Sequence, residues 1–219
     1  MSRADVCRRI EAVGIVPVVR APSPELAMRA AEAVLAGGIS IFEITMTVPN
    51  ATAAIRSLVD RLGDRAIVGA GTVLDAAAAH ACIEAGAAFI VSPGLDLPTI
   101  AAAHERGVPI MPGALTPTEV ITAWKAGADM VKIFPASAVG GPKYLKALRG
   151  PLPDVKLLPT GGVNAQTAGE YIAAGAAALG VGSELVDTAA LVRGEDAVLT
   201  ERARELCAAV AAARARNQV

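Results

Sequence analysis

Short apolar runs alternate along the chain with longer segments in which apolar and polar residues recur at helical spacing. Eight of these runs predict β-strands, at residues 15–19, 39–42, 66–68, 89–91, 108–111, 130–134, 155–158 and 178–181. The clearest amphipathic segments predict helices at residues 25–35, 51–62 and 116–126, with two flanking helices at 5–12 and 196–214. Such an alternation is typical of parallel βα units.

Glycines recur where a helical segment passes into the next apolar run. They stand at positions 37, 63, 86, 107, 127, 150 and 175, which are 20 to 26 residues apart, the length of one strand, one helix and two short loops. We therefore expect each to close a helix. Eight such units predict an α/β fold, a single (β/α)8 TIM barrel with an extra N-terminal helix and one domain over residues 1–219. The alternative is an open doubly wound sheet, for which the Gly69-Ala70-Gly71 segment is weak support because a dinucleotide fingerprint needs a third glycine.

Composition narrows the class of protein. Hydrophobic residues make up 53% of the chain and aromatic residues only 3%, which excludes a disordered chain and favours a core of small aliphatic groups. The net charge is −1 with no basic block, so we expect no nucleic-acid or membrane partner. No apolar run reaches the roughly 20 residues of a membrane span, and no leader pattern opens the chain, so we expect a mature, soluble protein. Cys7, Cys82 and Cys207 form no C-x-x-C pair, which favours the cytoplasm.

The most informative residue is a lysine inside a predicted strand. Strand periodicity places Lys132 on one face with Met130 and Phe134, and the β-branched Val131 and Ile133 on the other. We expect the β-branched face to meet the helices, so Lys132 points into the barrel. Burial disfavours a charged ammonium group, which makes a neutral, nucleophilic amine accessible for Schiff-base chemistry. The alternative is a structural lysine whose charged ammonium group extends to the mouth of the barrel or pairs with a carboxylate.

The same test places an acid in the interior. Glu43 shares a face with Ile41 and Thr45, whereas Phe42 and Ile44 face the helices. A buried ion pair contributes little to stability, because the desolvation of both charges offsets their attraction. The functional interpretation is that Glu43 transfers protons for a substrate held on the lysine.

Two glycine-rich segments follow the last two predicted strands. They are Thr160-Gly161-Gly162 and Gly182-Ser183. In barrels these two loops often bind phosphate, because glycines let backbone N–H groups approach the ligand. We therefore expect a phosphorylated ligand, ordinary turn glycines being the alternative. His80 and His104 have no partner at metal-ligand spacing, so we expect neither a metal nor a cofactor.

Five motifs, in this order and spacing, resemble the 2-keto-3-deoxy-6-phosphogluconate (KDPG) aldolase family. They are GAGTVL at 69–74, SPG at 92–94, MPG at 111–113, VKIFPA at 131–136 and PTGGV at 159–163. The resemblance implies a metal-free class I aldolase of the Entner–Doudoroff pathway, a homotrimer of barrels that cleaves KDPG to pyruvate and D-glyceraldehyde 3-phosphate. It also implies that Lys132 is the Schiff-base lysine and Glu43 the general acid/base. The substrate-binding residues that follow from the motifs and strand ends are Arg20, Thr47, Thr72, Pro93, Thr160, Gly161, Gly162, Gly182 and Ser183.

One position departs from the family pattern. Many members read Glu-x-Thr-x-Arg on the second strand, where this chain has Thr47 in place of the arginine that binds the pyruvate carboxylate. Arg20 resembles an arginine of the related phosphogalactonate aldolases and is the candidate replacement. Cleavage of the C4 epimer, or of a broader range of 4-hydroxy-2-oxo acids, therefore stays open. Outside the class, a phosphosugar epimerase or a non-catalytic phosphosugar-binding barrel has the same fold but no need for an inward lysine.

Overall fold

The structure is a computed structural model that describes residues 1–216. The strands are β1 (Ile15–Val19), β2 (Ile41–Thr45), β3 (Ile67–Gly71), β4 (Ile90–Val91), β5 (Ile110–Met111), β6 (Gly113–Ala114), β7 (Val131–Ile133), β8 (Leu157–Pro159) and β9 (Leu179–Val181). The first helices are α1 (Arg3–Val13), α2 (Pro24–Ala36), α3 (Ala51–Leu62), α4 (Ala76–Glu84) and α5 (Leu97–Glu105). The later helices are α6 (Pro117–Lys125), α7 (Pro142–Arg149), α8 (Ala165–Ala173), α9 (Thr188–Arg193) and α10 (Asp196–Arg216). Short 3-10 turns lie at Gly63–Arg65 and Ala136–Val139.

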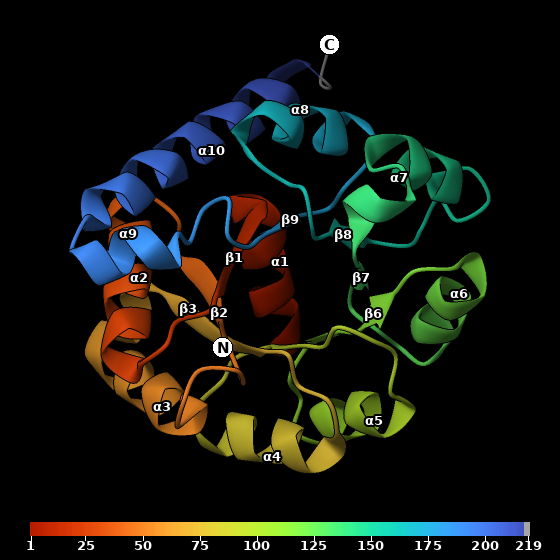
Figure 1. Cartoon of the computed structure of the whole chain (residues 1–219). Coiled ribbons are helices and arrows are strands. Elements are labelled where there is room, and N and C mark those ends of the chain that lie inside the picture. The colour runs from red at the N-terminus through yellow and green to blue at the C-terminus, as the bar shows by residue number, and fades with distance from the viewer. Residues whose placement is uncertain (217–219) are drawn as a thin grey trace.

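Every strand pair is parallel, as the sequence predicts. One sheet has the order β5-β4-β3-β2-β1-β9, and a second has the order β6-β7-β8. Isolated parallel pairs, Leu157 with Ala176 and Thr160 with Gly180, connect the segment of β8 to that of β9. Figure 1 shows the helices as a ring around the strands. The prediction of an α/β fold built on a parallel sheet is confirmed, with the sheet curved at least into a half-barrel.

The predicted fifth strand at residues 108–111 is present but shorter, and a second short strand follows it. Only Ile110 and Met111 form β5, and the chain resumes as β6 after Pro112. β5 pairs with β4 and β6 pairs with β7, and hydrogen bonds to both neighbours continue across Pro112: Asp129 N–H donates to the Ile110 carbonyl at 3.0 Å, and Gly113 N–H donates to the Gly94 carbonyl at 3.2 Å. Five of the seven predicted helix-closing glycines, at positions 63, 86, 107, 127 and 175, have a positive φ. Gly37 and Gly150 are right-handed, and at the end of α2 the next residue, Gly38, has the positive φ.

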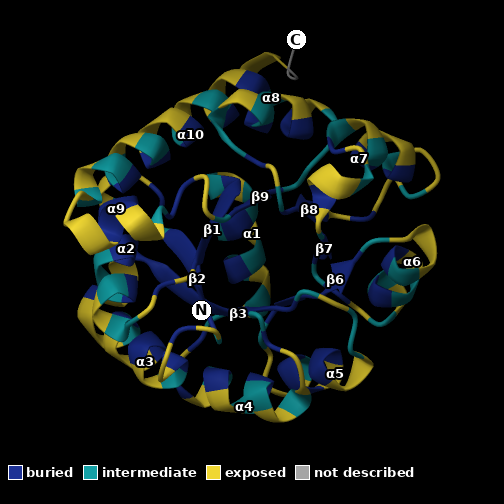
Figure 2. Cartoon of the chain, viewed as in Figure 1, coloured by how far each residue is buried: buried dark blue, intermediate teal, exposed yellow. Residues whose placement is uncertain are grey.

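Two apolar clusters hold the fold together. The larger lies between strands and helices and includes Phe42, Ile44 and Val131. The smaller fills the space enclosed by the strands and includes Ile41 and Met130. The predicted inward and outward faces of β2 and β7 are therefore confirmed, and Figure 2 shows the buried strands inside helices whose outer faces are exposed.

Helix α1 lies behind the strands near the centre of the ring in Figure 1. Val6 and Ile10 of this helix belong to the inner cluster. Arg3 Nε lies 2.7 Å from Asp129 Oδ1, in the segment that leads into β7. The helix thus closes the end of the strand assembly where β7 begins and leaves the opposite end, where the strands finish, free for a site.

Candidate active site

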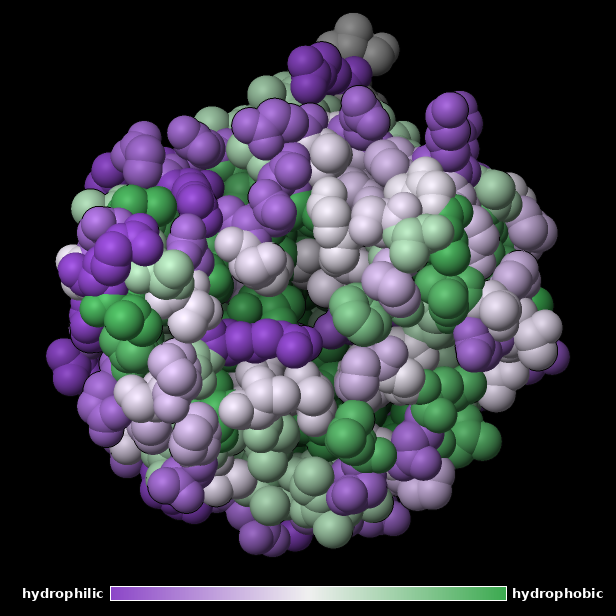
Figure 3. All heavy atoms as spheres, in the orientation of Figure 1, coloured by the Kyte–Doolittle hydropathy of each residue, from purple (hydrophilic) through white to green (hydrophobic). Residues whose placement is uncertain are grey.

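A cavity of about 390 Å³ lies at the carboxyl ends of the strands. Its lining consists of Val18, Arg20, Lys132, Phe134, Thr160, Gly161, Gly162, Val163, Gly182, Ser183, Glu184, Val186 and Thr188. In Figure 3 this face of the molecule is hollowed near its centre, with hydrophilic atoms crossing an apolar floor. The cavity therefore combines a mostly apolar wall with a few polar groups, as ligand sites commonly do.

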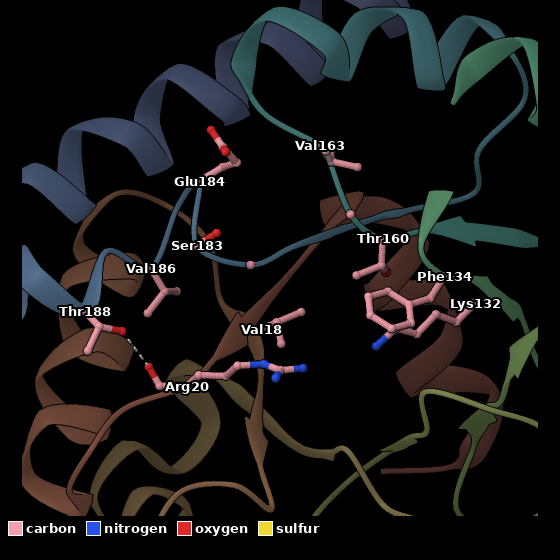
Figure 4. A pocket seen from close by; sticks show the side chains of 13 residues that line it. Val18, Arg20, Lys132, Phe134, Thr160, Val163, Ser183, Glu184, Val186 and Thr188 are labelled. Atoms are coloured by element: carbon pink, nitrogen blue, oxygen red, sulfur yellow. Dashed lines mark hydrogen bonds between the residues drawn. The ribbon is translucent and has the colours of Figure 1, made fainter. Parts of the chain in front are cut away.

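Lys132 reaches the cavity from the inner face of β7. Its side chain is only 4% exposed, and its Nζ lies 5.4 Å from the centre of the Phe134 ring, at cation–π distance. The backbone N–H of Lys132 donates to the carbonyl of Pro112 at 2.9 Å, which fixes the strand beneath it. Figure 4 shows the amine pointing toward the middle of the cavity. The position of the lysine is that predicted from strand periodicity.

Glu43 lies on the inner face of β2 beside this lysine. Its Oε1 is 3.9 Å from Lys132 Nζ, and its side chain is 1% exposed. Oε1 has no hydrogen-bond partner within residues 1–216. Burial raises the pKa of Glu43, while the positive charges of Lys132 and Arg20 oppose that rise. A buried carboxyl group with a free oxygen can both accept and return a proton.

Arg20, just after β1, points into the same cavity. In Figure 4 its guanidinium group converges with the Lys132 amine. Its own carbonyl accepts a hydrogen bond from Thr188 Oγ1 at 3.3 Å, which ties the backbone to α9. The guanidinium group makes no ion pair or hydrogen bond in the part of the chain that the structure describes. It is therefore available to bind a carboxylate.

Thr47 follows β2, and its hydroxyl group has a partner within the protein. Its hydroxyl group lies 2.7 Å from that of Thr45, which in turn donates to the carbonyl of Val19 at 3.0 Å. Thr47 does not line the cavity. These hydroxyl groups link the end of β2 to the end of β1, directly before Arg20.

Two loops form the opposite wall of the cavity. Gly161 and Gly162 follow β8 with φ values of 99° and 71°, a region that L side chains rarely adopt. Gly182 and Ser183 follow β9. Among residues 1–216, the backbone N–H groups of these four residues donate to no carbonyl. Free N–H groups gathered on one wall are suited to an anion.

Four of the predicted site residues stand outside the cavity lining. Thr72 follows β3 with a φ of 58°, which is unusual for a β-branched residue. Pro93 packs so closely against Gly113 that a Cβ on this glycine would lie 2.2 Å from the proline carbonyl. Thr47 and Glu43 are the other two. Conversely, sequence reasoning missed lining residues such as Val18, Val186 and Thr188, whose types carry no chemical signal. Val163 and Glu184 could have been found, because they directly follow the predicted Gly162 and Ser183.

Within residues 1–216, no three His, Cys, Asp or Glu side chains are grouped so as to hold a metal ion. In the same range, no helix combines the length and the apolar character needed to cross a membrane.

Comparison with known proteins identifies the family. The "KDPG and KHG aldolase" family model matches residues 6–201. The KHG/KDPG aldolase of Escherichia coli (strain K12) is 39% identical over 191 residues, covering 87% of this chain and 89% of the relative. The 2-dehydro-3-deoxy-6-phosphogalactonate aldolase of the same organism is 38% identical over 172 residues, covering 78% and 83%.

Solved structures agree with this assignment. The KDPG aldolase of Legionella pneumophila, with pyruvate captured as a covalent carbinolamine intermediate, superposes with a TM-score of 0.85 at 33% identity. The match covers 91% of this chain and 97% of that one. The predicted family, and with it an enzyme of the aldehyde-lyase class, is confirmed: the chain belongs to the KDPG and KHG aldolase family.

Proposed function

We propose that this chain is a class I aldolase that cleaves KDPG to pyruvate and D-glyceraldehyde 3-phosphate through a Schiff base on Lys132. The observation that carries the proposal is a buried pair: Lys132 lines the cavity, and Glu43 Oε1 lies 3.9 Å from the Lys132 amine. An epimerase or a non-catalytic binding barrel has no use for this pair, and an aldolase needs both members.

The chemistry starts at the C2 ketone of the substrate. Lys132 Nζ attacks C2 to form a carbinolamine, which loses water to give an iminium ion. Glu43 removes the proton of the C4 hydroxyl group, directly or through a water molecule, and the C3–C4 bond breaks. The bond electrons pass into the iminium to form an enamine while the aldehyde leaves. Protonation of C3 by Glu43 and hydrolysis of the resulting iminium release pyruvate and restore the free lysine.

The two ends of the substrate bind to opposite walls. Arg20 binds the C1 carboxylate, supported by its free guanidinium group and its direction toward the lysine. In the family pattern, Thr72 adds a contact to this carboxylate, and Pro93 and Thr47 lie beside it. The phosphate group binds to the N–H groups of Gly161, Gly162, Gly182 and Ser183. Thr160, whose buried hydroxyl oxygen has no hydrogen-bond partner in residues 1–216, faces the substrate between the two ends.

A second candidate is cleavage of the C4 epimer, 2-keto-3-deoxy-6-phosphogalactonate. The observation that favours it is the arginine at position 20 together with threonine at position 47, the arrangement that resembles the phosphogalactonate aldolases. A broader activity on 4-hydroxy-2-oxoglutarate follows from the same site when the phosphate wall is left unused.

The proposal also includes closure of the barrel, a single domain and assembly into a trimer. The continuation of β5 into β6 and the bridges between the β8 and β9 segments support closure of the strands into one (β/α)8 barrel, with α1 as the extra N-terminal helix. The barrel forms one domain; residues 217–219 of the expected 1–219 span lie outside the described residues. By resemblance to the family, the protein is a cytoplasmic homotrimer of the Entner–Doudoroff pathway. The three free cysteines fit a reducing compartment.

A cleavage assay tests the proposal. Pyruvate release is measured with KDPG, with its C4 epimer and with 4-hydroxy-2-oxoglutarate, each in the presence of a chelator in excess. We expect turnover that persists with the chelator, is greatest with KDPG and is lost in Lys132→Met. Preference for the epimer would favour the second candidate, and absence of turnover with all three acids would refute the aldolase assignment.

A further inference from the structure

We infer that Gly71 is a positioning residue for the acid/base step: the absence of a side chain at this glycine provides the space in which the Glu43 carboxyl group lies. The inference rests on the proposed role of Glu43 and adds to it the residue that determines where the carboxyl group can be. Gly71 lies at the end of β3 and has no side chain, so its part is to leave space for the Glu43 carboxyl group.

The steric evidence is direct. A Cβ added to Gly71 would lie 2.4 Å from Glu43 Oε1, 2.5 Å from Cδ and 3.0 Å from Cγ. The three atoms nearest to the added carbon all belong to the Glu43 side chain. Carbon and oxygen atoms at such distances overlap strongly, so the carboxyl group and any side chain at position 71 exclude one another.

The surroundings explain why the carboxyl group rests against Gly71. In the parallel pairing of β2 with β3, Glu43 is opposite Gly69 and Thr45 is opposite Gly71. The space over Gly69 is already filled by the Phe89 ring, since a Cβ on Gly69 would lie 2.3 Å from it. The glutamate side chain therefore lies over the next inward position of β3. Met46 N–H donates to the Gly71 carbonyl at 2.8 Å, which holds this part of the strand in place.

A methyl group at position 71 would act on Glu43 rather than on the backbone. Gly71 lies in a β-strand and does not have the left-handed φ that strains L residues. The atoms it would meet form the mobile end of a side chain, which can swing aside without moving a strand. Displacement of a catalytic group by about 1 Å can cost about 100-fold in rate. Gly71→Ala should therefore preserve the fold and the imine, and impair proton transfer.

A double-mutant cycle with Glu43→Ala tests the inference. We expect Gly71→Ala to lower kcat by about 10- to 100-fold in the wild-type background and by less than about twofold in the Glu43→Ala background. Borohydride trapping of pyruvate on Lys132 should continue in Gly71→Ala. Gly150→Ala is the matched control, because Gly150 has a right-handed helical φ and its added Cβ would come no closer than 3.5 Å to other atoms. It should leave kcat unchanged.

The same cycle measured by thermal unfolding separates this inference from the proposed function. The difference in Tm between wild type and Gly71→Ala should vary with pH, because the displaced group titrates, and this variation should vanish with Glu43→Ala. If Gly71→Ala does not fold but the Gly71→Ala/Glu43→Ala protein does, the steric account is supported. If neither variant folds, the account is overturned. The account is also overturned if Gly71→Ala lowers kcat equally in the wild-type and Glu43→Ala backgrounds, or if it does not lower kcat at all. If the wild-type protein shows no turnover, the proposed function is refuted. The Tm values of the same variants then still test whether a side chain at position 71 displaces the Glu43 carboxyl group.

Discussion

Lys132 Nζ lies 3.9 Å from Glu43 Oε1, with both side chains almost completely buried. The distance is too long for a hydrogen bond, so Oε1 has no partner within residues 1–216. The pair is close enough for each charge to stabilise the other, yet the carboxyl oxygen is free to meet a third group. In the proposed mechanism, this oxygen accepts the proton of the C4 hydroxyl group while the substrate is bound to the amine through C2.

Glu43→Gln should separate the two halves of the reaction. The amide keeps the shape of the side chain but cannot accept the C4 hydroxyl proton, so we expect turnover to fall by about 100- to 10,000-fold. Imine formation on Lys132 should persist. The two steps are measured by pyruvate release and by borohydride trapping. Turnover equal to that of the wild type would contradict a proton-transfer role.

The buried acid should also influence stability in a pH-dependent way. Burial raises the folded-state pKa of Glu43 above its ordinary value of 4.5, so the folded protein binds its proton more tightly than the unfolded chain does. The resulting stabilisation is present below pH 4.5 and is lost as the pH rises through the folded-state pKa. Glu43→Gln removes this contribution. Urea unfolding between about pH 4 and pH 8 should show the variant gaining stability relative to wild type as the pH rises; a constant difference would contradict this.

Arg20 and Thr47 should contribute unequally to carboxylate binding. The Arg20 guanidinium group is free to bind the substrate, whereas the Thr47 hydroxyl group is engaged with Thr45. We expect Arg20→Met to raise the KM for KDPG by about tenfold or more, because a charge-assisted hydrogen bond is lost. Thr47→Val should change this KM by less than about threefold. A larger rise in KM for Thr47→Val than for Arg20→Met would indicate that the substrate carboxylate binds at the end of the second strand.

Ser183→Ala should act on the phosphate end alone. Its hydroxyl group lies on the wall formed by the two glycine-rich loops. We expect the KM for KDPG to rise several-fold, because the phosphate loses a hydrogen-bond donor. The unphosphorylated substrate, 4-hydroxy-2-oxoglutarate, should keep its wild-type KM. Steady-state kinetics with the two acids measure this difference, and an equal rise for both would place the phosphate elsewhere.

Much of this architecture could be predicted from the sequence because strand burial has a period of two. That period divided each strand into two faces, and the expectation that β-branched Val131 and Ile133 meet the helices placed Lys132 inward. The recurring glycines indicated the number of βα units. The division of the fifth strand into β5 and β6 was not predictable from hydropathy, because Pro112 stands inside an apolar run.

Contacts across strands could not be predicted, for a physical reason. The overlap of position 71 with Glu43 depends on the register of β2 and β3 and on the ring of Phe89 over Gly69. The link between Thr45 and Thr47 depends on the turn after β2. A single sequence does not encode these distances in any local pattern, so the predicted role of Thr47 rested on resemblance alone.

Formation of the covalent intermediate on Lys132 is central to the proposed mechanism, and one measurement tests it most directly. The protein is incubated with pyruvate, reduced with borohydride, digested and analysed by peptide mass spectrometry. We predict one stable pyruvate-derived adduct on Lys132 and none at that position in Lys132→Met. Absence of the adduct, or its formation on another lysine while Lys132 stays unmodified, would contradict the mechanism.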